Sequence, residues 1–379
     1  MITYDAVVIG LGVMGSAVLR SVAARGLRVL GIDRQHPPHA LGSSHGRARM
    51  IREAYFEHPL YVPLVRHAYD LWERLERESG TTLLRITGGA FIGKEGSELV
   101  SGTLESSRLH GIPVDVVDGA ELGRVFPAFA QQPGIRAVLE RRAGYLDPDR
   151  CVRALLDRAE ESGAERRIEE VIGWESESGH HDGRLRVITD GGEHVTDSLV
   201  LAAGPWLPSL PTGHRLPLTV ERVVQAAFAP DRPADYTEES LPVFAWEFEP
   251  GRVFYGFPAI EGAVKVGLHH GTPVSDPDSA SREVSATETD EVRSLVRKFL
   301  PGADGPLVEA NICFYTKTPD GHFLIDRLPG LEQVLLVSCC SGHGFKFAPA
   351  IGELVADLLT QGASGFDISP FSLSRFEDG

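Results

Sequence analysis

The first 33 residues constrain the fold most, because they place a glycine-rich turn between an apolar strand and a helix. The short segment at 4–10, YDAVVIG, is apolar and rich in β-branched residues, which is typical of a buried strand. The segment at 11–26 has turn glycines, helical apolar spacing and a terminal glycine that suits a helix cap. A second buried strand is predicted at 27–33 from LRVLGID. Together these segments predict one β-α-β unit.

The glycines of the turn, Gly10, Gly12 and Gly15, have the G-x-G-x-x-G spacing of dinucleotide-binding units. The first permits a tight turn, the second lets a pyrophosphate approach the backbone, and the third lets helix and strand pack closely. Asp33 ends the second strand, where a carboxylate can hydrogen-bond the adenosine ribose. The unit predicts a bound dinucleotide but leaves FAD and NAD as alternatives. A buried strand ending in Ala-Gly at 198–204 is typical of a flavoprotein.

The rest of the chain predicts an α/β region that is interrupted by an antiparallel one. Amphipathic helices are expected at 61–80, 147–164 and 285–301. Alternating strands and turns between 222 and 270 indicate an antiparallel sheet. Such interleaving predicts two discontinuous domains with a cleft between them. The expected nucleotide-binding domain comprises 1–88, 147–218 and 316–379, and the expected substrate domain comprises 89–146 and 219–315.

Composition and charge exclude several classes of protein. With 379 residues, 42% of them hydrophobic, the chain can bury a substantial core. Its net charge of −16 argues against a basic surface for nucleic acids or anionic membranes. No apolar run approaches the length of a membrane helix, and no leader pattern precedes the first strand. The four cysteines form no C-x-x-C pair, so we expect a cytoplasmic protein.

Several stretches along nearly the whole chain carry a family resemblance: GLGVMGS, PPHALGSSHGRARMIREAY, YGFP, VKVGLHH, CFYTKTPDGHFLID and SGHGFKF. Through them the sequence resembles the monomeric sarcosine oxidase family of amine oxidases, which includes N-methyltryptophan oxidase and pipecolate oxidase. The resemblance implies a Rossmann-like FAD-binding domain of the glutathione-reductase or D-amino-acid-oxidase type, interleaved with a mostly antiparallel substrate domain. It also implies a monomer that oxidises the C–N bond of a secondary amino acid with O2, giving H2O2 and an imine that hydrolyses.

Cys313 matches the cysteine through which this family holds FAD covalently, by a thioether to the 8α carbon of the flavin. A nearby positive charge would favour the reactive thiolate, and Lys317 is a candidate for it. Taken alone, the residue also fits a buried core cysteine. A metal site could be considered at Cys339, Cys340 and His343. These residues lack a fourth ligand at suitable spacing, so we expect a strand end there and no metal.

The resemblance also implies roles at the substrate. Arg52 and Lys346 match the pair that binds the substrate carboxylate, which suits a guanidinium fork and a point charge. Lys265 matches the lysine that activates oxygen with the flavin, because a cation stabilises developing superoxide. The other expected residues are His269 beside the amine, Tyr255 and Tyr315 around the pocket, and Arg49 beside the flavin ring. The catalytic set is therefore Lys265, His269, Arg49 and Tyr315.

A larger set is expected to contact FAD, and in the early loop the sequence departs from the family. The set is Gly10, Gly12, Met14, Gly15, Asp33, Arg34, Ser43, His45, Arg49, Cys313, Gly342, Gly344, Phe345 and Lys346. Arg47 and Ala48 replace two residues of the family pattern HGDTR. The missing hydroxyl at Ala48 removes one hydrogen bond on the flavin side, and we expect Arg47 to be exposed.

Substrate size is the least determined property. Ala245 stands where the smaller family members have a methionine over the active site, which would open space for a larger substituent. A sarcosine-like substrate and a larger, N-methyltryptophan- or pipecolate-type substrate both stay open. Two other classes of protein are alternatives: an NAD-dependent dehydrogenase, and a flavoprotein dehydrogenase or electron carrier without oxidase activity.

Overall fold

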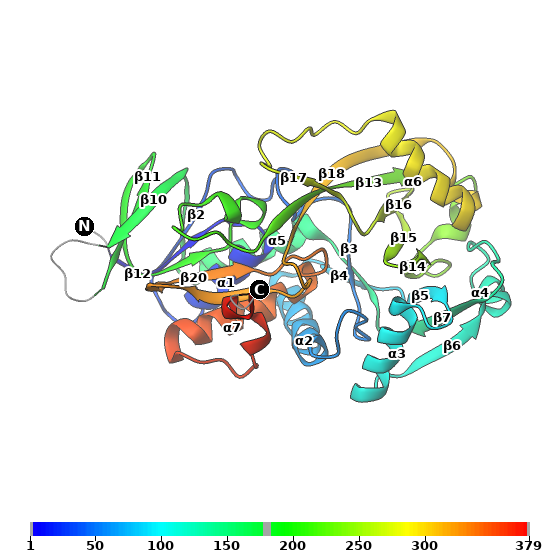
Figure 1. Cartoon of the computed structure of the whole chain (residues 1–379), viewed down its shortest axis with the longest axis horizontal. Coiled ribbons are helices and arrows are strands. Elements are labelled where there is room, and N and C mark those ends of the chain that lie inside the picture. Colours follow the sequence, from blue (N-terminus) through cyan, green and yellow to red (C-terminus); the bar gives the residue numbers. More distant parts are fainter. Residues whose placement is uncertain (1–2, 177–182, 377–379) are drawn as a thin grey trace.

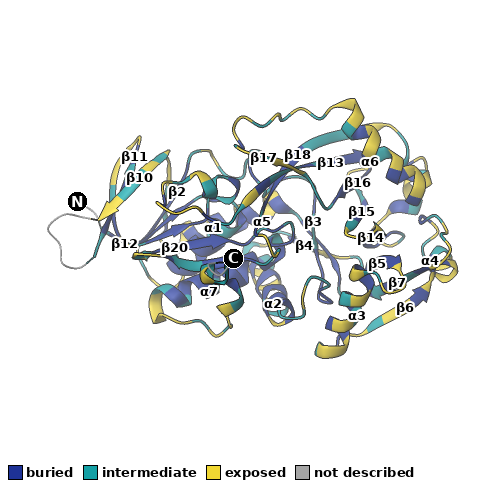
Figure 2. Cartoon of the chain, in the orientation of Figure 1, coloured by how far each residue is buried: buried dark blue, intermediate teal, exposed yellow. Residues whose placement is uncertain are grey.

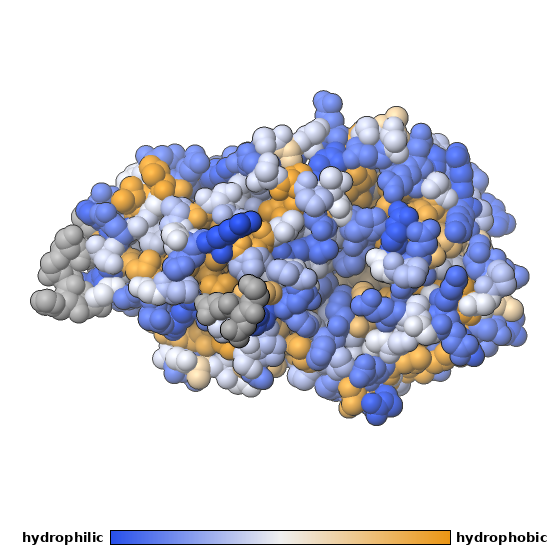
Figure 3. Space-filling model, viewed as in Figure 1, coloured by the Kyte–Doolittle hydropathy of each residue, from blue (hydrophilic) through white to orange (hydrophobic). Residues whose placement is uncertain are grey.

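The computed structural model describes residues 3–176 and 183–376, and its core consists of two large sheets that lie side by side (Figure 1). Among the described residues, no helix has both the length and the apolar character needed to cross a membrane. Hydrophilic residues cover most of the face drawn in Figure 3. Buried residues concentrate in the sheets and on the helix faces turned toward them (Figure 2).

The first sheet is mixed and has eight strands in the order β10-β11-β12-β1-β2-β9, with β20 on β12 and β19 on β20. Strands β9, β2, β1, β12 and β20 run parallel to their neighbours in this series. Their carboxyl ends therefore meet at one edge, where a ligand can bind. The bounds are β1 (Thr3–Ile9), β2 (Val29–Asp33), β9 (Glu165–Ile168), β10 (Val171–Ser176), β11 (Leu185–Thr189), β12 (Gly192–Leu201), β19 (Leu324–Leu328) and β20 (Leu331–Ser338).

Four helices cover one face of this sheet and form the largest hydrophobic core with it. They are α1 (Val13–Ala23), α2 (Tyr61–Ser79), α5 (Pro148–Glu161) and α7 (Ala348–Gln361). Helix α5 begins after Asp147, whose side chain accepts a hydrogen bond from the N–H of Arg150. Helix α2 ends at Gly80, which adopts the left-handed conformation. Local capping therefore sets the ends of both helices.

The second sheet has nine strands in the order β17-β13-β16-β15-β14-β5-β7-β6, with β18 also paired to β13. All of its pairs are antiparallel except β5 with β14. The bounds are β5 (Gly89–Lys94), β6 (Val114–Asp118), β7 (Ile135–Glu140), β13 (Thr219–Phe228), β14 (Val243–Glu249), β15 (Arg252–Ile260), β16 (Ala263–Leu268), β17 (Thr272–Val274) and β18 (Leu307–Lys317). Three helices flank it: α3 (Glu98–His110), α4 (Gly119–Val125) and α6 (Ala286–Phe299).

A small antiparallel sheet has the strand order β3-β8-β4. Its strands are β3 (Arg49–Ile51), β8 (Gly144–Leu146) and β4 (Leu84–Ile86). Short 3-10 helices elsewhere in the described residues are η1 (Gly204–Ser209), η2 (Pro233–Tyr236), η3 (Pro301–Ala303), η4 (Phe345–Phe347), η5 (Ser369–Phe371) and η6 (Leu373–Phe376). Arg49 begins β3 and Arg52 directly follows it, so this sheet fixes the backbone that carries both guanidinium groups.

The expected fold class is confirmed, since a parallel nucleotide-type sheet alternates along the chain with a mostly antiparallel one. The helix expected at 285–301 is shorter, running from Ala286 to Phe299. A capping box of Ser285 and Glu288 starts it, and Pro301 follows its end. The first sheet takes its strands from residues 3–33, 165–201 and 324–338, and the second from 89–140 and 219–317. The division into two domains stays a prediction.

Candidate active site

One cavity of about 450 Å³ connects the glycine-rich turn with the face of the second sheet. Its walls come from the carboxyl edge of the first sheet, from the loop before β3, and from strands β13 to β16 and β18. Most of the expected site residues line it, and the three that do not are Gly15, His45 and Cys313. Two ends can be distinguished: one at the glycine-rich turn and one among the buried lysines and arginines.

Backbone geometry makes the glycine end. Gly10 has a φ of +88°, and a Cβ added there would lie 2.7 Å from the carbonyl oxygen of Ala202. A Cβ on Gly15 would lie 1.7 Å from the carbonyl oxygen of Gly10, so α1 packs on the turn only because position 15 is glycine. The carboxylate of Asp33 accepts from the N–H of Leu11 at 2.7 Å. Asp33 thus braces the turn, and its bond to a ribose stays a prediction.

The loop at 43–45 leaves buried polar atoms without a partner, as expected at a ligand site. Ser43 Oγ and His45 Nε2 are buried and make no hydrogen bond, whereas Ser44 Oγ accepts from the N–H of Val13 at 3.0 Å. Burial, with Arg49 and Lys265 nearby, lowers the pKa of His45 to about 3, so its ring is neutral. Together with the glycine turn, these donors and acceptors fit a dinucleotide such as FAD.

Arg34 closes the outer end of the glycine side. Its guanidinium stacks over the ring of Trp206 at 4.4 Å and donates to Asp278 Oδ2 at 2.8 Å. The indole N–H of Trp206 also donates to Asp278, at 2.9 Å. Arg34 lines the cavity as expected, and Trp206 and Asp278 are wall residues that the sequence did not single out.

Lys265 is buried on β16 and donates to the carbonyl oxygen of Ala48 at 2.7 Å. A backbone carbonyl makes this contact, so it does not need the hydroxyl that Ala48 lacks. Burial, followed by repulsion from Arg49, holds the pKa of Lys265 well below its ordinary value. The loop turns next to the lysine at Gly46, whose φ of +94° is a conformation that favours glycine.

Cys313 lies on β18 next to the cavity wall, where Arg49 touches it. Arg49 Nη2 is 3.4 Å from Cys313 Sγ and also donates to the carbonyl oxygen of Ser43 at 2.9 Å. The positive charge beside the sulfur therefore comes from Arg49. The expectation that Lys317 supplies it is wrong, because Lys317 pairs with Glu221 at 3.2 Å. The fold therefore brings the guanidinium of Arg49, and not the ammonium of Lys317, to the sulfur.

Two tyrosines and a histidine meet where β15, β16 and β18 approach the turn after β20. The ring of His269 lies 5.5 Å from that of Tyr315 and 6.4 Å from that of Tyr255. A Cβ on Gly342 would lie 2.9 Å from His269 and 3.0 Å from Tyr315, which explains the glycine. Burial lowers the pKa of His269 to about 4. Ala245 lines the wall and pairs across the sheet with Tyr255.

Arg52 is fully buried and is already engaged by a carboxylate of the chain. Its Nη2 lies 2.6 Å from Glu57 Oε1, and its guanidinium stacks over the ring of Tyr55 at 4.1 Å. Burial alone would raise the pKa of Glu57, but Arg52 and other nearby cations lower it to about 2. Sequence reasoning missed Glu57, because one glutamate five residues after an arginine in a loop carries no periodic signal.

Lys346 is held by a short polar chain beside Arg52. Its Nζ donates to the carbonyl oxygen of His343 at 2.6 Å and to the hydroxyl of Tyr55 at 3.2 Å. The Tyr55 hydroxyl lies 2.7 Å from His343 Nδ1, and His343 Nε2 lies 3.0 Å from the carbonyl oxygen of Gly321. A carbonyl only accepts, so Nε2 carries the proton and Nδ1 accepts from Tyr55. Burial, then Arg52, lowers the pKa of Lys346 to about 7.

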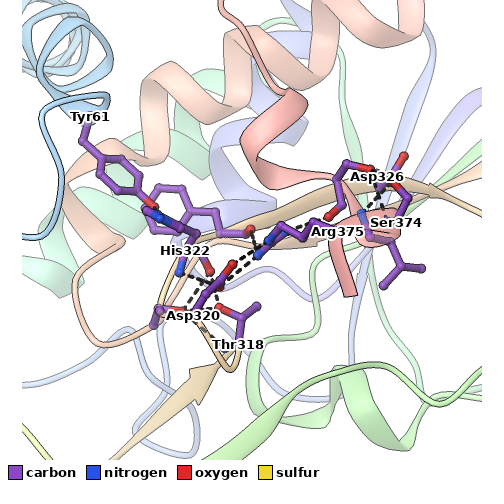
Figure 4. Close-up of polar contacts among 12 residues, drawn as sticks. Tyr61, Thr318, Asp320, His322, Asp326, Ser374 and Arg375 are labelled. Atoms are coloured by element: carbon purple, nitrogen blue, oxygen red, sulfur yellow. Dashed lines mark hydrogen bonds and ion pairs between the residues drawn. The ribbon is translucent and has the colours of Figure 1, made fainter. Parts of the chain in front are cut away.

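The turn that follows β18 is fixed by the carboxyl-terminal segment (Figure 4). Arg375 Nε pairs with Asp320 Oδ2 at 2.7 Å, and the hydroxyl of Thr318 donates to the carbonyl oxygen of His322 at 2.5 Å. The Tyr61 hydroxyl lies 3.0 Å from His322 Nδ1. The carboxyl-terminal segment and Tyr61 therefore hold the turn from both sides. The carbonyl oxygen of Gly321 in this turn accepts from His343, which in turn contacts Lys346.

Arg47 is not exposed, contrary to the expectation from its sequence position. Its side chain is 17% exposed, its Nε donates to Glu309 Oε2 at 2.8 Å, and its Nη1 donates to the carbonyl oxygen of Ile260 at 2.9 Å. Glu309 lies on β18, far from the loop in sequence. The partner could not be identified from the sequence, since only the sheet brings residues 47 and 309 together.

Comparison with known proteins identifies the family of the chain. The family model described as FAD dependent oxidoreductase matches residues 5–358. The chain is 38% identical to a monomeric sarcosine oxidase of Streptomyces avermitilis, over 98% of both chains. It is 36% identical to an N-methyl-L-tryptophan oxidase of Yersinia pestis, over 98% of this chain and 99% of the relative.

A solved structure of NikD, an unusual amino acid oxidase essential for nikkomycin biosynthesis, is similar to the whole molecule. It has a TM-score of 0.85 and 25% sequence identity, over 98% of both chains. The glycine-rich turn, the cavity along it and the full-length matches lead to the same assignment. The chain belongs to the FAD-dependent oxidoreductase family, in the group that contains monomeric sarcosine oxidase and N-methyl-L-tryptophan oxidase.

Proposed function

We propose that this chain oxidises the C–N bond of a secondary amino acid and transfers the electrons to O2. The observation that carries the proposal is the cationic end of the cavity, where Arg52, Lys346 and Lys265 are buried. A guanidinium and an ammonium side by side suit the carboxylate of an amino acid. FAD, when bound, supplies a two-electron acceptor that O2 reoxidises.

The residues around the amine favour its neutral form, whose lone pair the oxidation requires. His269 is a neutral imidazole at pH 7 and can accept a hydrogen bond from an amine N–H. Burial raises the pKa of Tyr255 to about 12, so its phenol stays protonated. Glu57 contacts only Nη2 of Arg52, so a substrate carboxylate would share the guanidinium with Glu57 and compete with it for the positive charge.

Lys265 is the proposed site at which the electrons reach oxygen. Its side chain is buried on β16 and lines the cavity. Its ammonium can stabilise negative charge that develops on O2. The ring of Phe257, 5.1 Å from its Nζ, adds a cation–π contact that favours the ammonium.

We further propose a thioether between Cys313 Sγ and the 8α carbon of FAD. The bond replaces one S–H and one C–H, and O2 takes the two electrons and two protons as H2O2. The contact between Arg49 and Sγ supports the proposal, since a thiolate is the nucleophile. All four cysteines are free, and we propose a reducing, cytoplasmic location for the protein. We also propose that it is a monomer.

The Cys313→Ala variant tests the thioether. We expect acid precipitation to leave the flavin with wild-type protein and to release it from Cys313→Ala. Cys340→Ser is the matched control, because Cys340 lines the cavity but lies on another segment. Yellow precipitated Cys313→Ala protein would remove the assignment.

A peroxide assay tests the overall function. We expect H2O2 from a secondary amino acid among sarcosine, N-methyl-L-tryptophan, L-proline and L-pipecolate, and none from the corresponding amines that lack the carboxylate. Flavin reduction without peroxide would indicate the electron-carrier alternative. Turnover that depends on added NAD would indicate the dehydrogenase alternative.

A further inference from the structure

A second, small chamber lies next to Lys265. It measures about 10 Å³, room for one water molecule, and its walls come from the loop before β3 and from strands β13, β16 and β18. The lining residues are Arg47, Gln225, Ala226, Ala227, Lys265, Glu309 and Asn311. Lys265 and Gln225 also line the main cavity, so the two spaces share a wall.

The sheet register explains why these residues meet. Lys265 pairs with Ala227, and Ala227 pairs with Glu309, so the three lie in one row across β16, β13 and β18. Gln225 pairs with Asn311 in the neighbouring row, two residues along and therefore on the same face. Because Ala227 has only a methyl group between the lysine and the glutamate, space remains above it.

The chamber contains acceptors that nothing satisfies. Gln225 Oε1 and Asn311 Oδ1 are buried and make no hydrogen bond. Gln225 is 3% exposed. The Lys265 ammonium has three N–H groups, one of which donates to Ala48. One water could accept from Lys265 and donate to both amide oxygens, which is the usual number of bonds for a buried water.

An ion pair whose two side chains are partly exposed forms one wall of the chamber. Arg47 Nε donates to Glu309 Oε2 at 2.8 Å, and Asn311 Nδ2 donates to Glu309 Oε1 at 2.8 Å. Arg47 also reaches Glu261 at 3.4 Å, but the Glu261 side chain is 85% exposed. Of the two carboxylates that Arg47 contacts, only Glu309 lines the chamber.

We propose that one buried water molecule occupies this chamber, and that Arg47 and Glu309 are positioning residues that set the charge and orientation of Lys265. The proposal rests on the oxygen-side role of Lys265 given above. The charged and titratable groups that face Lys265 come from two parts of the chain. His45 and Arg47 lie in the loop before β3 and Arg49 begins that strand, whereas Glu309 and Cys313 lie on β18. Of these, Glu309 favours the ammonium and the two arginines oppose it, whereas Cys313 carries no charge once it forms the proposed thioether.

The kinetic test uses flavin reoxidation by O2, measured against pH by stopped-flow absorbance. We expect Glu309→Gln to shift the pH at which reoxidation slows downward by about one unit, because the ammonium loses a favourable charge. Arg47→Gln should shift it upward, and Arg47→Gln/Glu309→Gln should return it toward wild type. Glu261→Gln, which alters the exposed partner of Arg47, should leave it unchanged.

Opposite shifts distinguish electrostatic positioning from structural damage, which would move both single variants the same way. Shifts in one direction, or a Glu309→Gln profile identical to that of Glu261→Gln, overturn the proposed role of the ion pair. Lys265→Met, measured in parallel, tests the underlying function. Normal reoxidation in Lys265→Met would remove the oxygen role itself, whereas slow reoxidation with unshifted Glu309→Gln would remove only the inference.

The water site is tested without activity. A crystal structure at a resolution that orders waters should show one water bonded to Lys265, Gln225 and Asn311. Ala227→Val, which fills the chamber and changes no charge, should expel it. An empty chamber in the wild-type crystal structure would overturn the water site.

Discussion

The two ends of the cavity are built in different ways. At the glycine end the backbone forms the site: a Cβ added to Gly10 or Gly15 would clash with a carbonyl oxygen, and Asp33 braces the turn. At the cationic end side chains form it, and residues from 52 to 346 meet there only in the fold. The first end therefore tolerates almost no added atom, and the second depends on charges that compete with one another.

The largest effect is expected from Gly15→Ala. The added Cβ would lie 1.7 Å from the carbonyl oxygen of Gly10, so α1 and the turn must separate. We expect a loss of about 3 kcal/mol in the free energy of unfolding and little bound FAD. Thermal melting and flavin absorbance measure both. Gly365→Ala is the control, since nothing lies within 4 Å of its added Cβ. Wild-type melting and flavin content in Gly15→Ala would show that the turn can adjust.

Arg52→Ala should have the next largest effect, on carboxylate binding. Loss of a charged hydrogen-bond donor costs about 1.5 to 3 kcal/mol, so we expect a Kd for propionate that is about tenfold to a hundredfold weaker. The variant also leaves Glu57 unpaired beside the ligand. Arg52→Ala/Glu57→Gln should therefore bind propionate more tightly than Arg52→Ala. Titration of the flavin absorbance measures both, and an unchanged Kd would exclude Arg52 as the anchor.

The same contrast explains what the sequence could predict. The glycine end was predicted because its parts lie within 33 residues and each has a local geometric reason. At the other end, family resemblance supplied the candidate roles, and residues such as Arg52 and Lys346 do line one cavity. The surroundings of two other cations were predicted wrongly: Lys317 pairs with Glu221, and Arg47 pairs with Glu309. Strand register and loop packing set these pairs, and neither has a signal in local spacing.

Lys346 should make carboxylate binding depend on pH. Burial, with Arg52 nearby, lowers its pKa to about 7, so it is charged below pH 7 and neutral above it. We expect the Kd for propionate to rise about tenfold per pH unit above this pKa, until the bound form also titrates. Lys346→Met should remove this dependence, because the guanidinium stays charged.

One other group near Arg52 titrates in the same range, because burial raises the pKa of Glu140 to about 7. The pKa values of His269 and Glu57 are about 4 and about 2. In flavin absorbance titrations with propionate, from about pH 6 to about pH 9, the part of the pH dependence that Lys346→Met removes therefore belongs to the lysine. A Kd that is flat over this range in the wild-type protein would mean that Lys346 does not bind the carboxylate as an ammonium.

The smallest effect is expected at Ala245, where the wall is shaped by size and not by charge. The side chain is buried on the cavity wall opposite Tyr255, so Ala245→Met adds three heavy atoms to the space available for the substrate. A few methylene groups in an apolar pocket change selectivity by about tenfold or more, so the ratio of kcat/KM for sarcosine to that for N-methyl-L-tryptophan should rise by about this factor. Ala245→Ser, which keeps the size nearly constant, should leave the ratio unchanged. A ratio that Ala245→Met does not alter would mean that the substituent lies elsewhere, and that substrate size is set by another part of the wall.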